Sequence, residues 1–214
     1  MKLYGYWRSS AAYRVRIGLN LKNLEVEEEF VHLQRLEQRG DDYLTLNPQG
    51  LVPTLIDGDV CLSQSLAILE YLDETHPEPP LLPSDPAGRA RVRQLAQVVA
   101  CDIHPIDNLK VLNFLTNEMG VSDEGRLTWY RHWVNQGLEG LEGLVASHPA
   151  TGRFCHGDQP SLADLCLVPQ LYNARRFDVN LDLYPILQSI DAACQSLQAF
   201  TKAAPEAQSD AVQV

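Results

Sequence analysis

The sequence has no apolar run long enough to cross a bilayer, and it is poor in basic residues. Its 17 lysines and arginines are outnumbered by 28 aspartates and glutamates, which leaves a formal net charge of −11 at pH 7. A membrane-spanning helix needs roughly 20 mostly apolar residues, and nucleic acids and anionic membranes bind basic surfaces. We therefore expect no membrane and no nucleic-acid partner. The negative net charge does not exclude a small anionic substrate, because a few clustered arginines can make the potential positive within one cleft.

Cysteine is also scarce, and its spacing matches no metal or redox motif. The five cysteines are odd in number, are scattered and include no Cys-x-x-Cys pair. We expect reduced, mostly packed thiols in a cytoplasmic protein. Cys101 and His104 make half of a metal-ligand pattern, but no second pair follows, so we predict no metal site. Met1 and Lys2 lead directly into a predicted strand, so we expect no signal peptide.

The chain is organised around the stretch from Trp7 to Leu21. Residues 2–6 predict a short strand that ends at a polar turn. The apolar residues of 12–21 form two rows at helical spacing, which predict a helix covered on more than one side. Arg8, Ser9 and Ser10 thus stand where a strand meets the N-terminus of a helix, whose unpaired N–H groups favour anions. Two interpretations follow: a serine that only caps the helix, or a site for a thiolate, carboxylate or phosphate. This stretch alone favours the cap.

The first 80 residues predict a compact α/β domain with a mixed sheet. After the first strand and helix, we expect a strand at 24–31, a helix at 35–46, a hairpin from 54–56 and 60–62, and a helix at 66–72 that Ser65 caps. The segment 77–86 holds five prolines, which predict a stiff linker.

The rest of the chain predicts helices alone. We expect a long helix over 87–117 that bends at Pro105, another over 124–148, and a buried helix opened by a capping box of Ser161 and Asp164. A shorter helix follows Pro185, and we expect the tail 203–214 to be frayed. The predicted domains are residues 1–80 and 87–204.

Several motifs of the chain recur in one known family. They are Arg8-Ser9-Ser10, Leu46-Asn47-Pro48, Val52-Pro53-Thr54-Leu55, Gln64-Ser65-Leu66-Ala67-Ile68, Ala163-Asp164-Leu165-Cys166 and Ala174-Arg175-Arg176-Phe177. Nearly the whole chain thereby resembles a cytosolic glutathione transferase, most closely of the zeta class, the family of maleylacetoacetate isomerases. The Val-Pro-Thr-Leu and Gln-Ser motifs indicate the superfamily, whereas Arg-Ser-Ser with Ala-Arg-Arg-Phe indicates the zeta class. The resemblance implies a thioredoxin-like N-terminal domain, an all-helical C-terminal domain and a homodimer.

The resemblance also implies that glutathione is the cofactor, and it assigns residues to it. The residues expected to contact glutathione are Ser9, Ser10, Gln38, Val52, Pro53, Gln64, Ser65, His104 and Asn108. A cis Val52–Pro53 bond would present the backbone of Val52 to glutathione, and Ser65 at a helix start would receive a carboxylate. Without the resemblance, Pro53 is an ordinary turn residue and Ser65 a plain cap.

The expected catalytic group is a hydroxyl that stabilises the glutathione thiolate. Ser9 is our first choice, Ser10 the second and Tyr6 the third. The family usually has cysteine after the two serines, whereas this chain has Ala11, which excludes a protein thiol at that position.

A maleyl keto acid carries two carboxylates, so the substrate needs cations near it. Arg8 and Arg176 are the candidates, and Lys110 could add a third positive charge. We take Arg175 to be a solvated surface cation, and we assign Asp164 to helix capping alone.

The implied reaction is cis–trans isomerisation: the thiolate adds to the double bond, the bond rotates, and elimination regenerates glutathione. We therefore predict an isomerase of maleylacetoacetate or of the related maleylpyruvate. Two alternatives stay open: a general glutathione transferase acting on electrophiles or α-haloacids, and a non-enzymatic binding protein of the same fold.

Overall fold

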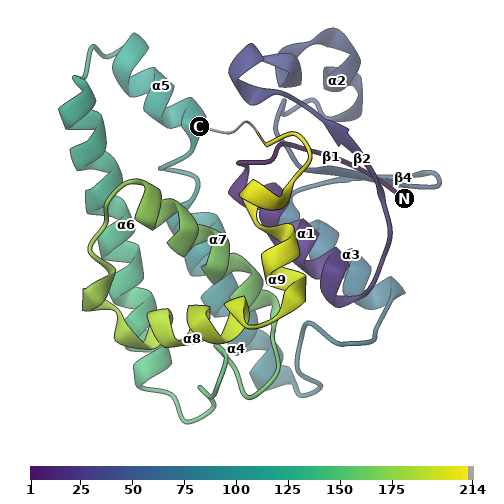
Figure 1. Ribbon diagram of the computed structural model, residues 1–214, viewed down its shortest axis with the longest axis vertical. Helices are drawn as coiled ribbons and strands as arrows, with labels where there is room; N and C mark the ends of the chain where they lie inside the picture. The colour runs from purple at the N-terminus through teal and green to yellow at the C-terminus, as the bar shows by residue number, and fades with distance from the viewer. Residues whose placement is uncertain (212–214) are drawn as a thin grey trace. The chain divides into compact units, whose positions relative to one another are not determined.

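The computed structural model describes residues 1–211 and divides into two compact units (Figure 1). The first unit contains residues 1–81 together with 195–211, and the second unit contains Leu82–Cys194. This division differs from the predicted boundary at the C-terminal end, where residues 195–204 were expected in the helical domain. No helix among the described residues is both long and apolar enough to cross a membrane.

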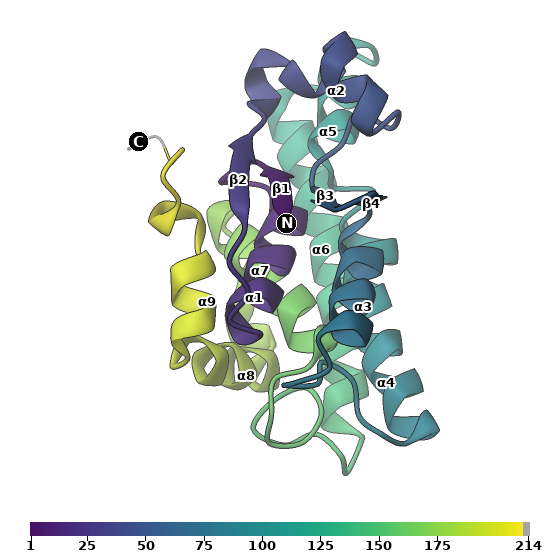
Figure 2. The ribbon, with the colours of Figure 1, turned by 90° about the vertical axis from the view of Figure 1, so that its right-hand side faces the viewer.

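The first unit is built on a four-stranded mixed sheet of order β2-β1-β3-β4. The strands are β1 (Lys2–Gly5), β2 (Glu27–Phe30), β3 (Thr54–Asp57) and β4 (Val60–Ser63). β1 pairs with β2 in parallel, and the β1/β3 and β3/β4 pairs are antiparallel, with Leu3 opposite Leu55. Figure 2 shows these strands side by side. The predicted strand order and hairpin are confirmed.

Helix α1 (Ser10–Leu21) is the buried helix of the first unit, as its two apolar rows predicted. It packs against α3 (Ser65–Thr75) and against α9 (Gln198–Ala203), which lies beside it in Figure 1. Its polar residues Arg14 and Arg16 are 2% and 6% exposed, so they too point into packed surroundings.

The helix predicted over 35–46 is confirmed only in its second half. The structure has two 3-10 turns, Leu33–Arg35 and Glu37–Arg39, before a short α2 (Asp41–Leu46). Leu36 between the two turns has a φ of 60°, a left-handed conformation that cannot continue a right-handed helix.

The prediction of a frayed tail is wrong for residues 203–211. Pro205–Ala207 forms a 3-10 turn, and Ala211 packs against a hydrophobic cluster that includes Tyr6, Trp7 and Val52. The remaining residues of the predicted tail, 212–214, lie outside the described residues.

The second unit is helical, as predicted. Its helices are α4 (Pro86–Gln97), a π-helical turn (Val98–Ile103), α5 (Leu109–Asn117), α6 (Asp123–Ala146), α7 (Leu162–Arg176) and α8 (Pro185–Gln195). The expected bend at Pro105 is a complete break, because residues 104–108 are not helical. α7 packs against α4 and the π-helical turn, and every residue from Leu162 to Leu171 is buried.

Candidate active site

Ser9 sits directly before α1 and caps it. Its φ and ψ are extended, and its Oγ accepts a hydrogen bond from the N–H of Ala12 at 3.2 Å. A serine hydroxyl has one donor and two acceptor sites, so this cap leaves the O–H free to donate elsewhere. The capping and thiolate-binding interpretations are therefore compatible. Ser10 is the first residue of the helix and is buried.

Ser65 occupies the first position of α3, and the structure holds its side chain in place. Nη1 of the buried Arg14 donates to Ser65 Oγ at 3.2 Å. Gln64 before it has a φ of 72°, a region that costs a non-glycine residue about 1–3 kcal/mol. Its side-chain amide donates to Gln49 Oε1 at 2.9 Å. The unpaired N–H groups at the start of α3 suit an anionic group such as a carboxylate.

The Val52–Pro53 peptide bond is cis, as predicted. Val52 belongs to the hydrophobic cluster that also contains Tyr6 and Trp7, so the structure brings the loop before β3 to the end of β1. Gln38 lies near this loop, because its carbonyl oxygen is 2.9 Å from where a Cβ on Gly50 would be. Gly50, with a φ of 59°, allows this approach.

Several buried polar atoms in this part of the first unit have no hydrogen-bond partner among the described residues. Gln38 Oε1 and Arg8 Nε are two of them. The Arg8 guanidinium lies over the Trp7 ring at 4.2 Å from its centroid, which orients it by a cation–π contact. An unpaired acceptor and an unpaired cationic donor suit a ligand that carries both N–H groups and carboxylates.

In the second unit, the structure brings His104 and Asn108 together across the break between helices. Their Nε2 and Nδ2 atoms are 3.3 Å apart. Asn108 caps α5, since its Oδ1 accepts from the N–H of Lys110 at 3.1 Å. The Lys110 side chain is exposed.

Arg176 and Arg175 end α7 in different environments. Arg176 Nη1 donates to Asn173 Oδ1 at 3.2 Å, and its guanidinium lies 5.5 Å from the centroid of the Phe177 ring. Arg175 is a surface cation, as expected, with 48% of its side chain exposed, but it also has a partner: its Nη2 is 2.6 Å from Oδ2 of the buried Asp191. A buried carboxylate needs a paired cation, so Arg175 has a structural partner.

The comparisons with known proteins cover nearly the whole chain. Residues 1–74 match the family model of the glutathione S-transferase N-terminal domain. A probable maleylacetoacetate isomerase of Vibrio cholerae is 55% identical over 98% of this chain and 97% of its own. The chain belongs to the zeta class of glutathione transferases.

Two solved structures of this class are especially similar. A holo maleylpyruvate isomerase of the zeta class has a TM-score of 0.97 and 48% identity, covering 99% of this chain and all of its own. A maleylacetoacetate isomerase from Methylobacterium extorquens AM1, solved with malonate and glutathione, has a TM-score of 0.97 and 45% identity over the full length of both chains.

The residues of this zeta-class chain fit glutathione. The free O–H of Ser9, the N-termini of α1 and α3, and the unpaired Gln38 Oε1 offer donors and an acceptor for a thiolate, a carboxylate and amide groups. The carboxylate of Asp164 accepts from the N–H groups of Cys155 and Ser161 at 2.8 Å each, so its assignment to capping holds. No group of three metal-binding side chains gathers within residues 1–211.

Sequence reasoning missed several residues that contact predicted site residues in the first unit or adjoin one along the chain in the second unit. Arg14 and Gln49 hold Ser65 and Gln64, and only the burial of α1 on several sides hinted at a role for Arg14. Asp107, next to Asn108, is 8% exposed, and neither of its carboxylate oxygens has a hydrogen-bond partner among the described residues. Desolvation raises the pKa of Asp107 to about 8. Nothing in its sequence context predicted this.

Proposed function

We propose that this protein is a glutathione-dependent cis–trans isomerase that converts maleylacetoacetate to fumarylacetoacetate in the catabolism of aromatic compounds. The observation that carries the proposal is the full-length similarity to isomerases, one of them solved with glutathione and the dicarboxylate malonate. Maleylpyruvate is a second candidate substrate, favoured by the similarity to a maleylpyruvate isomerase. We further propose that the protein works as a cytoplasmic homodimer, as the family implies.

Bound glutathione supplies the thiolate that adds reversibly to the double bond and so permits rotation. The contribution of the protein is to keep that thiol ionised. A hydroxyl donor such as that of Ser9 stabilises an anion by about 1.5–3 kcal/mol, and the N-terminus of α1 adds roughly 0.3–1 kcal/mol. At about 1.36 kcal/mol per unit, these terms lower the thiol pKa by about one to three units from ~8.5.

The remaining residues are proposed to bind and orient glutathione and the substrate. Ser65, fixed by Arg14, and the start of α3 suit a carboxylate of glutathione. His104 and Asn108 are proposed to contact glutathione as well. Arg8 and Arg176 are proposed to bind the two carboxylates of the substrate, because a guanidinium matches a carboxylate with two parallel hydrogen bonds, and Lys110 adds a positive charge.

Arg176→Ala tests the substrate assignment. The loss of one charge-assisted contact should lower turnover of a maleyl dicarboxylate about ten- to a hundredfold. The variant should still bind glutathione and conjugate a neutral electrophile at nearly the wild-type rate. Arg176→Lys is the matched control, since it keeps the charge without the planar fork. Its turnover of the maleyl dicarboxylate should lie between those of the wild type and Arg176→Ala.

Three outcomes would contradict the proposal. Equal losses with charged and neutral substrates would mean that Arg176 maintains the fold, and no loss with either would mean that it is only a surface cation. Isomerisation at the same rate without glutathione would exclude the proposed mechanism. The ratio of kcat/KM for the two maleyl keto acids decides between the candidate substrates.

A further inference from the structure

The turn that leads from β1 to Ser9 is held by residues far away in the sequence. The N–H of Ser9 donates to the carbonyl of Tyr6 at 2.9 Å, which closes the turn. The N–H of Trp7 inside it donates to Oδ2 of Asp210 at 3.0 Å. Asp210 belongs to the C-terminal segment and lies 203 residues along the chain from Trp7.

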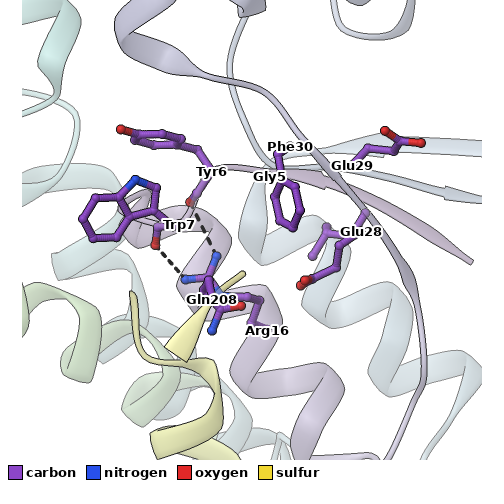
Figure 3. Close-up of a pocket in the computed structure, with 9 residues that line it drawn as sticks. Gly5, Tyr6, Trp7, Arg16, Glu28, Glu29, Phe30 and Gln208 are labelled. Carbon is purple, nitrogen blue, oxygen red and sulfur yellow. Dashed lines mark hydrogen bonds between the residues drawn. The ribbon is translucent and has the colours of Figure 1, made fainter. Parts of the chain in front are cut away.

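Arg16 holds the same turn from the other side. Its Nη2 donates to the carbonyl of Trp7 at 3.0 Å, and its Nη1 lies 3.5 Å from the carbonyl of Tyr6 (Figure 3). Its Nε donates to the carbonyl of Ala203 at 3.1 Å. One guanidinium therefore joins the turn before Ser9 to the end of α9.

These groups lie in a nearly dry environment. Arg16 is 6% exposed, and burial lowers its pKa to about 10 although the charges of Glu28 and Asp210 oppose the shift. A cavity of about 10 Å³, with room for about one water, is lined by Arg16, Glu28 and Gln208 among others (Figure 3). Hydrogen bonds to charged groups are strong in such surroundings, so Asp210 and Arg16 restrain the turn firmly.

We propose that Asp210 and Arg16 are positioning residues for catalysis, and that the C-terminal segment 203–211 holds Ser9 in the place where its hydroxyl meets the thiolate. The proposal rests on the function proposed for Ser9. Asp210 touches the backbone two residues before Ser9, so it acts through that residue. Hydroxyl donation to an anion depends steeply on distance and angle, and a loosened turn therefore weakens it.

The sign of the effect separates positioning from charge. If Asp210 acted only as a nearby negative charge, its removal would lower the pKa of the bound glutathione thiol. If it positions Ser9, Asp210→Ala raises that pKa. Asp210→Asn removes the charge but keeps an oxygen that can accept from the N–H of Trp7, so its thiol pKa should stay at or slightly below that of the wild type.

The experiment titrates the thiolate of glutathione bound to the full-length protein by its ultraviolet absorbance, and measures kcat and the glutathione KM of each variant. Asp210→Ala should lower kcat at pH 7 by on the order of tenfold, with the KM changed only a few-fold. Ser209→Ala, next to it and exposed, is the matched control and should behave like the wild type. Arg16→Lys, which keeps the charge but cannot span the same carbonyls, should raise the thiol pKa in the same direction.

The double variant Ser9→Ala/Asp210→Ala shows whether the two residues act together. With the Ser9 hydroxyl gone, Asp210→Ala should cause little further change in the thiol pKa. Equal shifts in both backgrounds, or equal downward shifts for Asp210→Ala and Asp210→Asn, would overturn the positioning role. If Ser9→Ala alone leaves the thiol pKa unchanged, it is the proposed function of Ser9 that fails.

Discussion

At the scale of single residues, Ser9 shows how one side chain can stabilise a helix and still serve chemistry. Its oxygen accepts from the N–H of Ala12, while its hydroxyl proton stays available. The neighbouring Arg8 is oriented over Trp7 with an unpaired Nε. A capping serine and a stacked arginine are ordinary features. Their proposed roles in ligand binding depend on the hydrogen-bond donors that the cap and the stacking leave unused.

Ser9→Ala should raise the pKa of the bound glutathione thiol by about one to two units, because a donor to the anion worth about 1.5–3 kcal/mol is lost. Ser9→Thr keeps the hydroxyl and should retain most of the activity. Titration of the bound thiol tests this. An unchanged value in Ser9→Ala with a raised value in Ser10→Ala would assign the role to Ser10, and an effect of Tyr6→Phe alone would exclude both serines.

Asp107 predicts a pH dependence of stability. Between an unfolded pKa near 4 and a folded pKa of about 8, the native chain binds more protons than the unfolded chain. The free energy of unfolding should therefore fall as the pH rises through this window. Asp107→Asn cannot ionise, so it should lose less stability than the wild type between pH 5 and pH 8.

Urea unfolding of Asp107→Asn at pH 5 and pH 8 measures this difference. Asp102→Asn, at an exposed position nearby, is the control, and its free energy of unfolding should match that of the wild type at both pH values. A parallel loss of stability with rising pH in Asp107→Asn and the wild type would refute the role of Asp107.

At the scale of elements, the buried helix α7 depends on its first turn. Asp164 accepts hydrogen bonds at 2.8 Å from the N–H of Cys155, the N–H of Ser161 and the hydroxyl of Ser161. The carboxylate is fully buried, so each of these donors would lose its partner in a dry environment. By contrast, Ser122 caps α6 through one exposed bond to the N–H of Gly125.

Asp164→Ala should therefore destabilise the protein by at least about 3 kcal/mol, since buried donors left unpaired cost roughly 1–3 kcal/mol each. Ser122→Ala should cost about 1 kcal/mol, the usual value for an exposed cap. Chemical denaturation measures the loss in free energy of unfolding for both variants. Similar losses would mean that burial does not increase the contribution of the α7 cap to stability.

At the scale of the whole molecule, the first unit is not continuous in sequence. Its helix α1 donates from Tyr13, Arg16 and Asn20 to carbonyls of residues 199–203. The side chain of Lys22 is buried with Asp73 and binds the carbonyls of His76 and Pro79, which ties the end of α1 to the linker. The C-terminal segment therefore completes a domain that begins at the N-terminus.

A fragment of residues 1–81 should consequently fail to fold cooperatively, because α1 would expose apolar surface and the buried Nε of Arg16 would lose its partner, the carbonyl of Ala203. Joining residues 195–211 to it through a long flexible linker should restore a cooperative transition. Circular dichroism during heating distinguishes the two. A sharp transition in the fragment alone would show that α9 is dispensable.

Much of this architecture follows from local sequence. The apolar rows of residues 12–21 predicted a helix buried on several sides, the Asp57-Gly58-Asp59 turn predicted the hairpin, and Ser161 with Asp164 predicted the start of α7. Such features depend on propensity and spacing, which a short segment contains in full. The cis bond at Pro53, by contrast, was predicted only from the family resemblance, because local sequence alone indicated an ordinary turn residue.

Other features were decided by tertiary structure. The 3-10 turns at Leu33–Arg39 replaced a predicted helix because Leu36 takes a left-handed conformation. The tail at 203–211 is ordered because Arg16 and Trp7 bind it, and Arg175 is paired because Asp191 is buried beside it. For the tail and for Arg175, the deciding partner lies outside the local segment. The desolvation that made Asp107 unusual likewise arises only when distant segments exclude water together.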